Sequence, residues 1–175
     1  AYTRYVLRIH PERDRAGMQP LVDDLNMEIG YLYRSSAIAP IRNDHALVYE
    51  DPRTAAGRPG SRAPHLLLEQ NGNTVSVLDL ASKHHVLLVG PDGANWANAT
   101  RHAASAMHIP LDTHILNPQS VSPETIEQFT RRYQVSQSGA VLIRPDGFIA
   151  WKATSNQNAQ EDFMKDVLIC VMGKG

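Results

Sequence analysis

The residues Gly139–Trp151, with the sequence GAVLIRPDGFIAW, restrict the fold of this chain more than any other stretch does. Two apolar runs, Ala140–Ile143 and Phe148–Trp151, flank the turn sequence RPDG at Arg144–Gly147. Proline presets the φ angle of a turn, and glycine adopts the positive φ that other residues avoid. We therefore expect an antiparallel β-hairpin. Because both arms are apolar almost throughout, other elements must cover the hairpin, as they do inside a layered domain.

Strands and helices alternate regularly around this hairpin. Val86–Val89 is a run of four apolar residues that ends at Gly-Pro-Asp-Gly, which is typical of a buried central strand. The other elements expected here are a helix over Ala94–Met107, a strand over His114–Leu116, a helix that Ser122-Pro123-Glu124 begins, and a helix over Ala159–Met172. A βαβ unit places its two strands in parallel with a right-handed crossover. This order, followed by a hairpin and a helix, predicts an α/β fold with a thioredoxin-like mixed central sheet flanked by helices.

The predicted helices each carry one apolar face. In the predicted helix that begins at Ser122-Pro123-Glu124, Ser122 is suited to the N-cap and Pro123 to the first helical position. The residues expected on the buried faces are Trp96, Ala99 and Ala103; Ile126, Phe129 and Tyr133; and Phe163, Val167 and Cys170 or Val171.

The first third of the chain has weaker signals. Apolar residues at helical spacing predict a helix over Met18–Ile29 that Gly30 ends, and Tyr31–Ile38 has a β-like pattern. Residues 39–64 are rich in proline and glycine, which indicates a linker or a functional loop. We expect a domain boundary there, with residues 1–56 as an N-terminal segment and residues 57–175 as the thioredoxin-like domain. Short strands are expected at Leu66–Glu69 and Thr74–Val77.

Composition restricts the partners and the compartment. Seventeen Lys and Arg residues balance eighteen Asp and Glu residues, so the charge gives no reason to propose nucleic acid or an anionic membrane as a partner. No run approaches the ~20 apolar residues that a membrane-spanning helix needs. The single cysteine, Cys170, cannot form an internal disulfide, and its apolar neighbours indicate a buried, inert thiol. We therefore expect a cytoplasmic protein.

The position at which a redox thioredoxin carries Cys-x-x-Cys has no cysteine here. That position is Gly90–Ala97, with the sequence GPDGANWA, and the later segment Ser136–Gly139 lacks the proline that faces the dithiol in redox members. These two differences exclude thiol–disulfide exchange at the usual site. An enzyme that relies on Cys170 alone is the remaining redox alternative.

Other chemical constellations are also missing from the sequence. His84 and His85 are adjacent, so on a strand they face opposite ways, and no metal-ligand spacing accompanies them. No Gly-x-Ser-x-Gly elbow or dinucleotide fingerprint occurs. Trp96 and Trp151 are expected in the core or an interface, with stacking on an aromatic ligand as the alternative. We assign no catalytic, cofactor-binding or metal-binding residue.

Four stretches together resemble the C-terminal part of the FAD-dependent aromatic monooxygenases of the phenol hydroxylase type. These are Tyr31–Ala37, Gly60–His65, Val86–Gly90 and Gly139–Trp151. In that family a G-x-R-A-P-H segment leads from the substrate domain into a thioredoxin-like domain without redox cysteines, and a hairpin similar to VLIRPDGFIAW lies near its end. The resemblance covers about residues 26–172. The family's flavin-binding Gly-x-Gly-x-x-Gly and Gly-Asp-Ala-Ala-His segments are absent.

The resemblance implies a non-catalytic domain with a structural or interaction role, in a parent enzyme that uses FAD and NADPH. The chain itself is expected to hold no cofactor. Its expected partner is the remainder of the flavin monooxygenase, and a second copy of the chain could instead cover the apolar face of residues 18–29. The structural and interface candidates are Arg62, Pro64, His65, Trp96, Arg144, Asp146, Gly147 and Trp151. The alternative hypothesis is a free-standing binding protein, in which Asn95, Trp96 and Ser138 line a small polar pocket.

Overall fold

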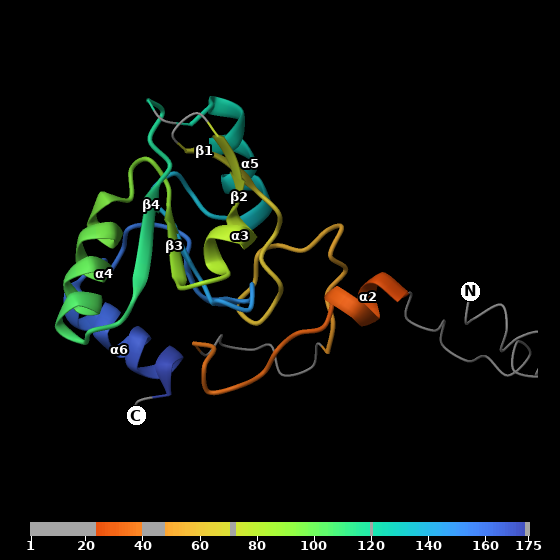
Figure 1. The fold of residues 1–175 in the computed structure, drawn as a ribbon, viewed down its shortest axis with the longest axis horizontal. Helices are drawn as coiled ribbons and strands as arrows, with labels where there is room; N and C mark the ends of the chain where they lie inside the picture. Colours follow the sequence, from red (N-terminus) through yellow and green to blue (C-terminus); the bar gives the residue numbers. More distant parts are fainter. Residues whose placement is uncertain (1–23, 40–47, 71–72, 120, 174–175) are drawn as a thin grey trace, which may run out of the picture.

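A four-stranded mixed sheet forms the centre of the molecule (Figure 1). The computed structural model describes residues 24–39, 48–70, 73–119 and 121–173. In the sheet, β3 (His85–Val89) pairs in parallel with β4 (Leu111–Ile115) and antiparallel with β5 (Ala140–Ile143), which pairs antiparallel with β6 (Ile149–Ala153). The strand order β4-β3-β5-β6 places β3 and β5 inside, and their buried residues confirm the predicted central strand and hairpin.

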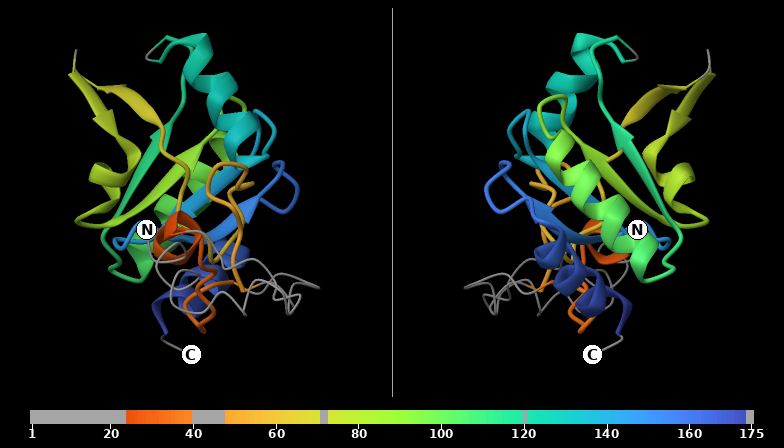
Figure 2. Two further views of the ribbon diagram at one scale, coloured as in Figure 1. Left: turned by 90° about the vertical axis from the view of Figure 1, so that its right-hand side faces the viewer. Right: turned by 90° about the vertical axis from the view of Figure 1, so that its left-hand side faces the viewer.

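Helices cover both faces of this sheet, as predicted. The helices α4 (Ala94–Ala106) and α6 (Glu161–Met172) lie on one face, where they contact Leu87 and Leu142. The helices α3 (Val77–Ala81) and α5 (Pro123–Tyr133) pack with the small hairpin of β1 (Leu67–Gln70) and β2 (Asn73–Ser76) on the other face (Figure 2). Successive residues of a strand point to opposite faces, so Val86 and Leu88 belong to this second core.

Local sequence signals explain where the helices begin. Ser122 has an extended backbone and accepts a hydrogen bond from the N–H of Thr125, while Pro123 occupies the first turn of α5. Ser76 caps α3 in the same way by accepting from the N–H of Leu78. The predicted apolar faces of α4 and α5 are buried.

The apolar face predicted for α6 is confirmed at Val167 and Val171 but not at Phe163. The buried residues of this helix are Met164, Val167, Leu168 and Val171. Phe163 lies at the rim of the core, where its ring contacts Trp96 and Trp151 but remains exposed. Cys170 is half-buried, and its Sγ donates to the carbonyl of Ser36 at 3.2 Å.

The segment that precedes the domain is irregular. The predicted helix before Gly30 is described only as α2 (Asp24–Ile29), and the rest of it lies outside the described residues. The strand predicted over Tyr31–Ile38 is wrong: Tyr31 pairs with Tyr49 as a single bridge, and residues 35–38 form a turn. Asp51 and Thr54 close another turn within the predicted loop region.

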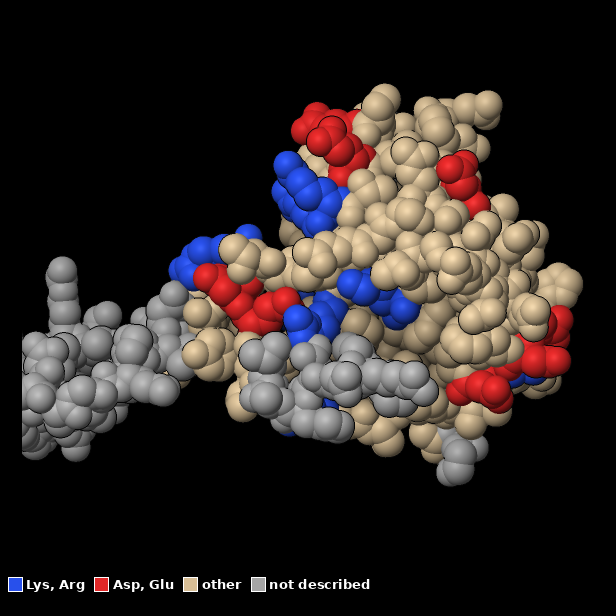
Figure 3. Space-filling view, turned by 180° about the vertical axis from the view of Figure 1, so that it is seen from behind, with Lys and Arg blue, Asp and Glu red and all other residues tan. Residues whose placement is uncertain are grey.

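Charged side chains of both signs are interspersed on the surface, with wide uncharged areas between them (Figure 3). None of the described helices has the length and apolar character needed to cross a bilayer.

Candidate functional site

The turn of the β5–β6 hairpin is closed by its own side chains. Gly147 has a φ of +81° and donates its N–H to the Arg144 carbonyl at 2.9 Å. Asp146 forms an ion pair with the Arg144 guanidinium at 2.6 Å, and its other carboxylate oxygen accepts from the N–H of Phe148 at 3.2 Å. These bonds fix the direction in which the Arg144 side chain leaves the turn.

Residues 60–63 pair with the outer arm of this hairpin. The N–H of Gly60 donates to the Ile149 carbonyl at 2.8 Å, the N–H of Ile149 donates to the Ser61 carbonyl at 2.9 Å, and the N–H of Ala63 donates to the Gly147 carbonyl at 2.8 Å. The segment that leads into the domain therefore runs antiparallel to the start of β6, with Arg62 opposite Phe148. The sequence alone did not predict this pairing.

Gly60 also makes the next contact possible. Its φ is +90°, and a Cβ atom there would lie 2.7 Å from the carbonyl oxygen of Tyr33. Because Gly60 has no Cβ, the N–H of Tyr33 reaches the Gly60 carbonyl at 2.7 Å. Residues 31–33, 60–63 and the hairpin thus lie side by side.

Two tyrosines of the leading segment cover the hairpin turn. The rings of Tyr31 and Tyr33 lie 5.2 and 5.8 Å from the ring of Phe148. The Arg144 guanidinium lies 5.1 Å from the centre of the Tyr33 ring, within the range of a cation–π contact.

The same arginine also acts on His85, the first residue of β3. Burial, and secondarily the positive charge of Arg144, lower the pKa of His85.

A second attachment holds Pro64 and His65 against α5. The Tyr133 hydroxyl donates to the Pro64 carbonyl at 2.7 Å, and the Arg132 guanidinium donates to the His65 carbonyl. Burial raises the pKa of Tyr133 above the usual tyrosine range, so its hydroxyl stays protonated and remains a donor. Both contacts use the backbone of residues 64 and 65 rather than their side chains.

Lys152 provides a third attachment, which the sequence analysis missed. Its Nζ donates to the carbonyls of Ala56 and Tyr133, each at 3.0 Å. Tyr133 is the last residue of α5, where the free carbonyls and the helix dipole favour a cation. Burial lowers the pKa of Lys152, and the nearby Glu50 carboxylate acts in the opposite direction. In the sequence, the signal for this attachment is the lysine within the otherwise apolar hairpin arm IAWKA.

The two tryptophans lie on the opposite face of the sheet from these attachments. Their rings meet edge to face at 4.9 Å, and Trp96 donates its indole N–H to the Ser155 carbonyl at 2.9 Å. Trp96 is 1% exposed and Trp151 is 7% exposed. The interpretation of both residues as core is confirmed.

The position of the missing dithiol is closed by backbone contacts. The N–H of Gly90 donates to the Gly139 carbonyl and that of Asp92 to the Gln137 carbonyl, both at 3.0 Å. A Cβ atom on Gly90 would lie 2.1 Å from the Gln137 oxygen, so the two segments touch directly.

The pocket predicted from Asn95, Trp96 and Ser138 is wrong because Trp96 is buried in the core. Asn95 instead lines a shallow hollow of about 250 Å³ between α4 and α6, together with His102 and Glu161. The pocket of the alternative hypothesis therefore does not form.

The predicted site residues thus fall into two groups. Arg62, Pro64, His65, Arg144, Asp146 and Gly147 gather at the junction between the leading segment and the sheet, and Trp96 and Trp151 lie in the other core. Within the described part of the chain, no three His, Cys, Asp or Glu residues are grouped closely enough to hold a metal ion.

Comparison with known proteins gives concordant matches. The family model described as aromatic-ring hydroxylase, C-terminal, matches residues 56–174. The 4-methyl-5-nitrocatechol 5-monooxygenase of Burkholderia sp is 38% identical over 175 residues, which cover 98% of this chain and 32% of the relative. The 2,4-dichlorophenol 6-monooxygenase of Delftia acidovorans is 34% identical over 160 residues, which cover 87% of this chain and 27% of the relative.

Solved structures show the same relationship. Aklavinone-11 hydroxylase, in a ternary complex with FAD and aklavinone, matches with a TM-score of 0.84 and 30% identity, over 97% of this chain and 31% of that one. The flavin-dependent monooxygenase PieE, in complex with FAD and substrate, matches with a TM-score of 0.71 and 31% identity, over 86% of this chain and 26% of that one. The chain therefore spans about a third of the length of its relatives. It belongs to the family of C-terminal domains of flavin-dependent aromatic-ring hydroxylases.

Proposed function

We propose that this domain is non-catalytic and that it docks onto the FAD- and substrate-binding portions of an aromatic hydroxylase. The observation that carries the proposal is the threefold attachment of the leading segment. The hairpin pairs with residues 60–63, Tyr133 binds Pro64, and Lys152 binds Ala56. Because the leading segment is bound to the domain at three places, its position relative to the domain is fixed. The portion of the enzyme that precedes this segment is therefore held in a defined position next to the domain.

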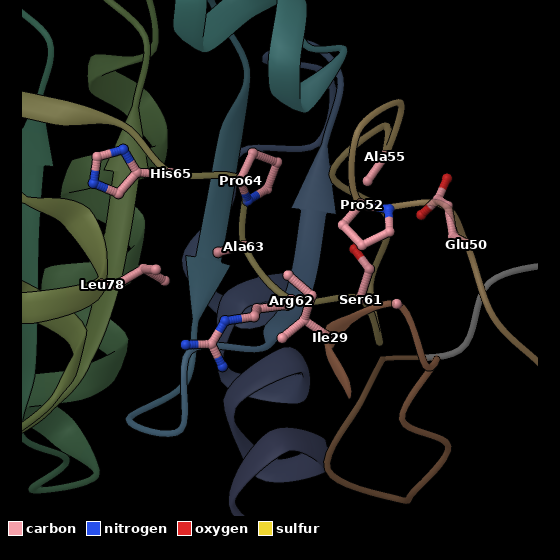
Figure 4. Close-up of a pocket in the computed structure, with 11 residues that line it drawn as sticks. Ile29, Glu50, Pro52, Ala55, Ser61, Arg62, Ala63, Pro64, His65 and Leu78 are labelled. Atoms are coloured by element: carbon pink, nitrogen blue, oxygen red, sulfur yellow. The ribbon is translucent and has the colours of Figure 1, made fainter. Parts of the chain in front are cut away.

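Neither of the two hollows described here, of which Figure 4 shows the one beside residues 61–65, has the size that the cofactor of such an enzyme needs. Pockets for drug-sized ligands occupy roughly 300–1,000 Å³, and FAD is larger still. The two hollows described here measure about 230 and 250 Å³. We infer that FAD and NADPH bind in the remainder of the enzyme and that this domain contributes no group to the reaction.

Exposed apolar side chains mark the surface that would face the rest of the enzyme. They lie on the leading segment, and they are Met27, Ile29, Tyr31, Tyr33, Val48 and Tyr49. Apolar side chains gathered on a surface are typical of an interaction site. We propose that the FAD- and substrate-binding portions cover them, with a second copy of the chain as the alternative occupant. The single cysteine is in keeping with a cytoplasmic enzyme.

The direct test uses the purified chain and the whole enzyme. The chain alone is expected to be colourless after incubation with FAD and gel filtration. The whole enzyme is expected to retain FAD and to couple NADPH oxidation to ring hydroxylation. Yellow chain that retains flavin absorbance would contradict the non-catalytic role.

The docking role has its own test in the whole enzyme. The double substitution Met27→Ser and Val48→Ser removes the two most exposed apolar side chains of this surface, and Leu67→Ser together with Ile169→Ser, which are exposed outside the leading segment, is the matched control. We expect the first pair to release the domain to limited proteolysis while FAD remains bound. Equal protease resistance in both double variants would refute docking through this surface.

A further inference from the structure

The strand β4 forms one edge of the central sheet, and its outer side pairs with no other described strand. Leu116, which follows β4, donates its N–H to the Val89 carbonyl of β3. Backbone groups alternate in direction along a strand, and those of every second residue face the same neighbour. The N–H and C=O groups of Leu111, Thr113 and Ile115 therefore point away from β3.

These outward backbone groups can receive another strand. Among the residues that the structure describes, only the Ile115 carbonyl has a backbone partner there, the N–H of Asn117 at 2.9 Å. No helix or strand passes in front of β4 in Figure 1. A row of unpaired N–H and C=O groups at a sheet edge is a template for pairing with a further chain.

The sequence of β4, Leu-Asp-Thr-His-Ile, is complementary to itself in the antiparallel direction. When two copies lie with Thr113 opposite Thr113, Leu111 of each copy lies opposite Ile115 of the other. All of these residues carry outward backbone groups, so each opposite pair exchanges both of its N–H···O bonds. The Ile115 carbonyl takes part as well, because a carbonyl oxygen has a second lone pair beside the one that accepts from Asn117.

Charge complementarity selects this register. Asp112 of each copy lies opposite His114 of the other, and a pair of this kind brings its side chains closest together. The Asp112 side chain is 55% exposed, and an imidazole N–H donates to its carboxylate in a charge-assisted hydrogen bond. The register centred one residue earlier places the two Asp112 carboxylates opposite each other, where like charges repel. The register centred one residue later places Asp112 opposite the apolar Leu116.

The other face of the strand contributes apolar contacts. Leu111 and Ile115 are half-buried and pack against the core that α4 covers. In the symmetric register each of them lies beside its counterpart in the second copy, which removes part of their remaining apolar surface from water.

We propose that two copies of this chain form a symmetric dimer in which their β4 strands pair antiparallel about Thr113. The two four-stranded sheets thereby become one continuous sheet. The interface is isologous, since the same strand of each copy supplies both halves. The dimer does not depend on the docking role proposed above, because β4 shares no residue with the exposed apolar surface of the leading segment.

Sedimentation equilibrium of the 175-residue chain over a range of concentrations tests the dimer. A single pair of strands is a small interface, so we expect a Kd on the order of 50 μM. A chain that stays monomeric at about ten times this concentration would overturn the proposal.

Thr113→Pro locates the interface on β4. Proline removes the outward N–H and places its ring at the edge, a position that sheets tolerate, so the fold should be retained. Fluorescence of the buried Trp96 and Trp151 checks this. We expect Thr113→Pro to weaken the dimer at least about tenfold, and the matched control Thr113→Val, which keeps the N–H and the branched shape, to leave it unchanged. Equal association of the two folded variants would refute pairing through β4.

An exchange of the two polar side chains tests the register without any proline. His114→Asp alone places carboxylates opposite each other and should weaken the dimer about tenfold. The double variant Asp112→His and His114→Asp restores opposite partners and should recover the original Kd to within about threefold. A folded double variant as weak as His114→Asp would overturn the register. A dimer that Met27→Ser and Val48→Ser dissociate, but that Thr113→Pro leaves intact, would place the second copy on the leading segment and refute the proposal.

Discussion

Replacing Lys152 with methionine removes its hydrogen bonds and keeps its apolar packing, so the change in the free energy of unfolding measures the hydrogen bonds alone. Methionine retains the length and apolar stem of lysine but cannot donate to the carbonyls of Ala56 and Tyr133. A hydrogen bond from a charged donor contributes roughly 1.5–3 kcal/mol, and we take about 1 kcal/mol for each because Lys152 is only half-buried. Lys152→Met should therefore lower the free energy of unfolding by about 2 kcal/mol.

This loss is measurable by urea unfolding and by heating. Trp96 and Trp151 are both buried, so their fluorescence reports the transition. For a chain of this size, 2 kcal/mol corresponds to a fall in Tm of roughly 4–8 °C. The matched control is Lys83→Met, because Lys83 is exposed; it should change stability by less than about 0.5 kcal/mol.

The pH dependence adds a second test of the same residue. The pKa of Lys152 is lowered in the folded state, so between that pKa and the unfolded value the unfolded chain binds more protons. The contribution of this lysine to stability therefore rises as the pH increases towards its unfolded pKa of about 10.4. The stability difference between wild type and Lys152→Met should grow on the alkaline side. Equal stability of Lys152→Met and Lys83→Met at every pH would refute the role of Lys152 as an attachment.

Three further predictions concern the junction and the sheet. Gly147→Ala, at a φ of +81°, should cost about 1–2 kcal/mol in urea unfolding, since a side chain is strained there; an unchanged midpoint would contradict this. Tyr133→Phe leaves the Pro64 carbonyl without its donor and should cost about 1–3 kcal/mol, with faster hydrogen exchange in residues 60–66 as the local signature. Burial lowers the pKa values of His85 and His114, so stability should fall as the pH decreases from about 6.5 through the folded pKa values; a double His→Gln variant should flatten this slope.

Local signals in the sequence predicted most of the domain. The hairpin turn depends on residues that are adjacent in the chain, and the start of α5 depends on Ser122 and Pro123, so both were readable without the fold. The strand β4 was predicted too short because it lies at the sheet edge. Its residues Asp112 and Thr113 interrupt the apolar run that marks a buried strand.

The junction could not be predicted in the same way, because its contacts join residues far apart in the chain. Residues 60–63 bear no strand pattern, since one backbone partner and a glycine at φ +90° decide their conformation. The tyrosines at positions 31 and 33 alternate with other residues as strand residues do. Their rings pack on Phe148 instead of continuing a sheet.

Lys152 is an example of a residue whose place in the sequence pattern indicates a contact with residues far away in the chain. Its register partner Val141 belongs to the core on the α5 side of the sheet, so a lysine at this position points towards a helix rather than towards water. A cation there needs acceptors, and a helix C-terminus supplies free carbonyls. For a sheet covered by helices, the lysine in IAWKA is the sequence signal from which a helix C-terminus above β6 follows, although the sequence analysis did not use it. The residue that interrupts the apolar pattern of the hairpin is thus the one that connects it to α5 and to the segment leading into the domain.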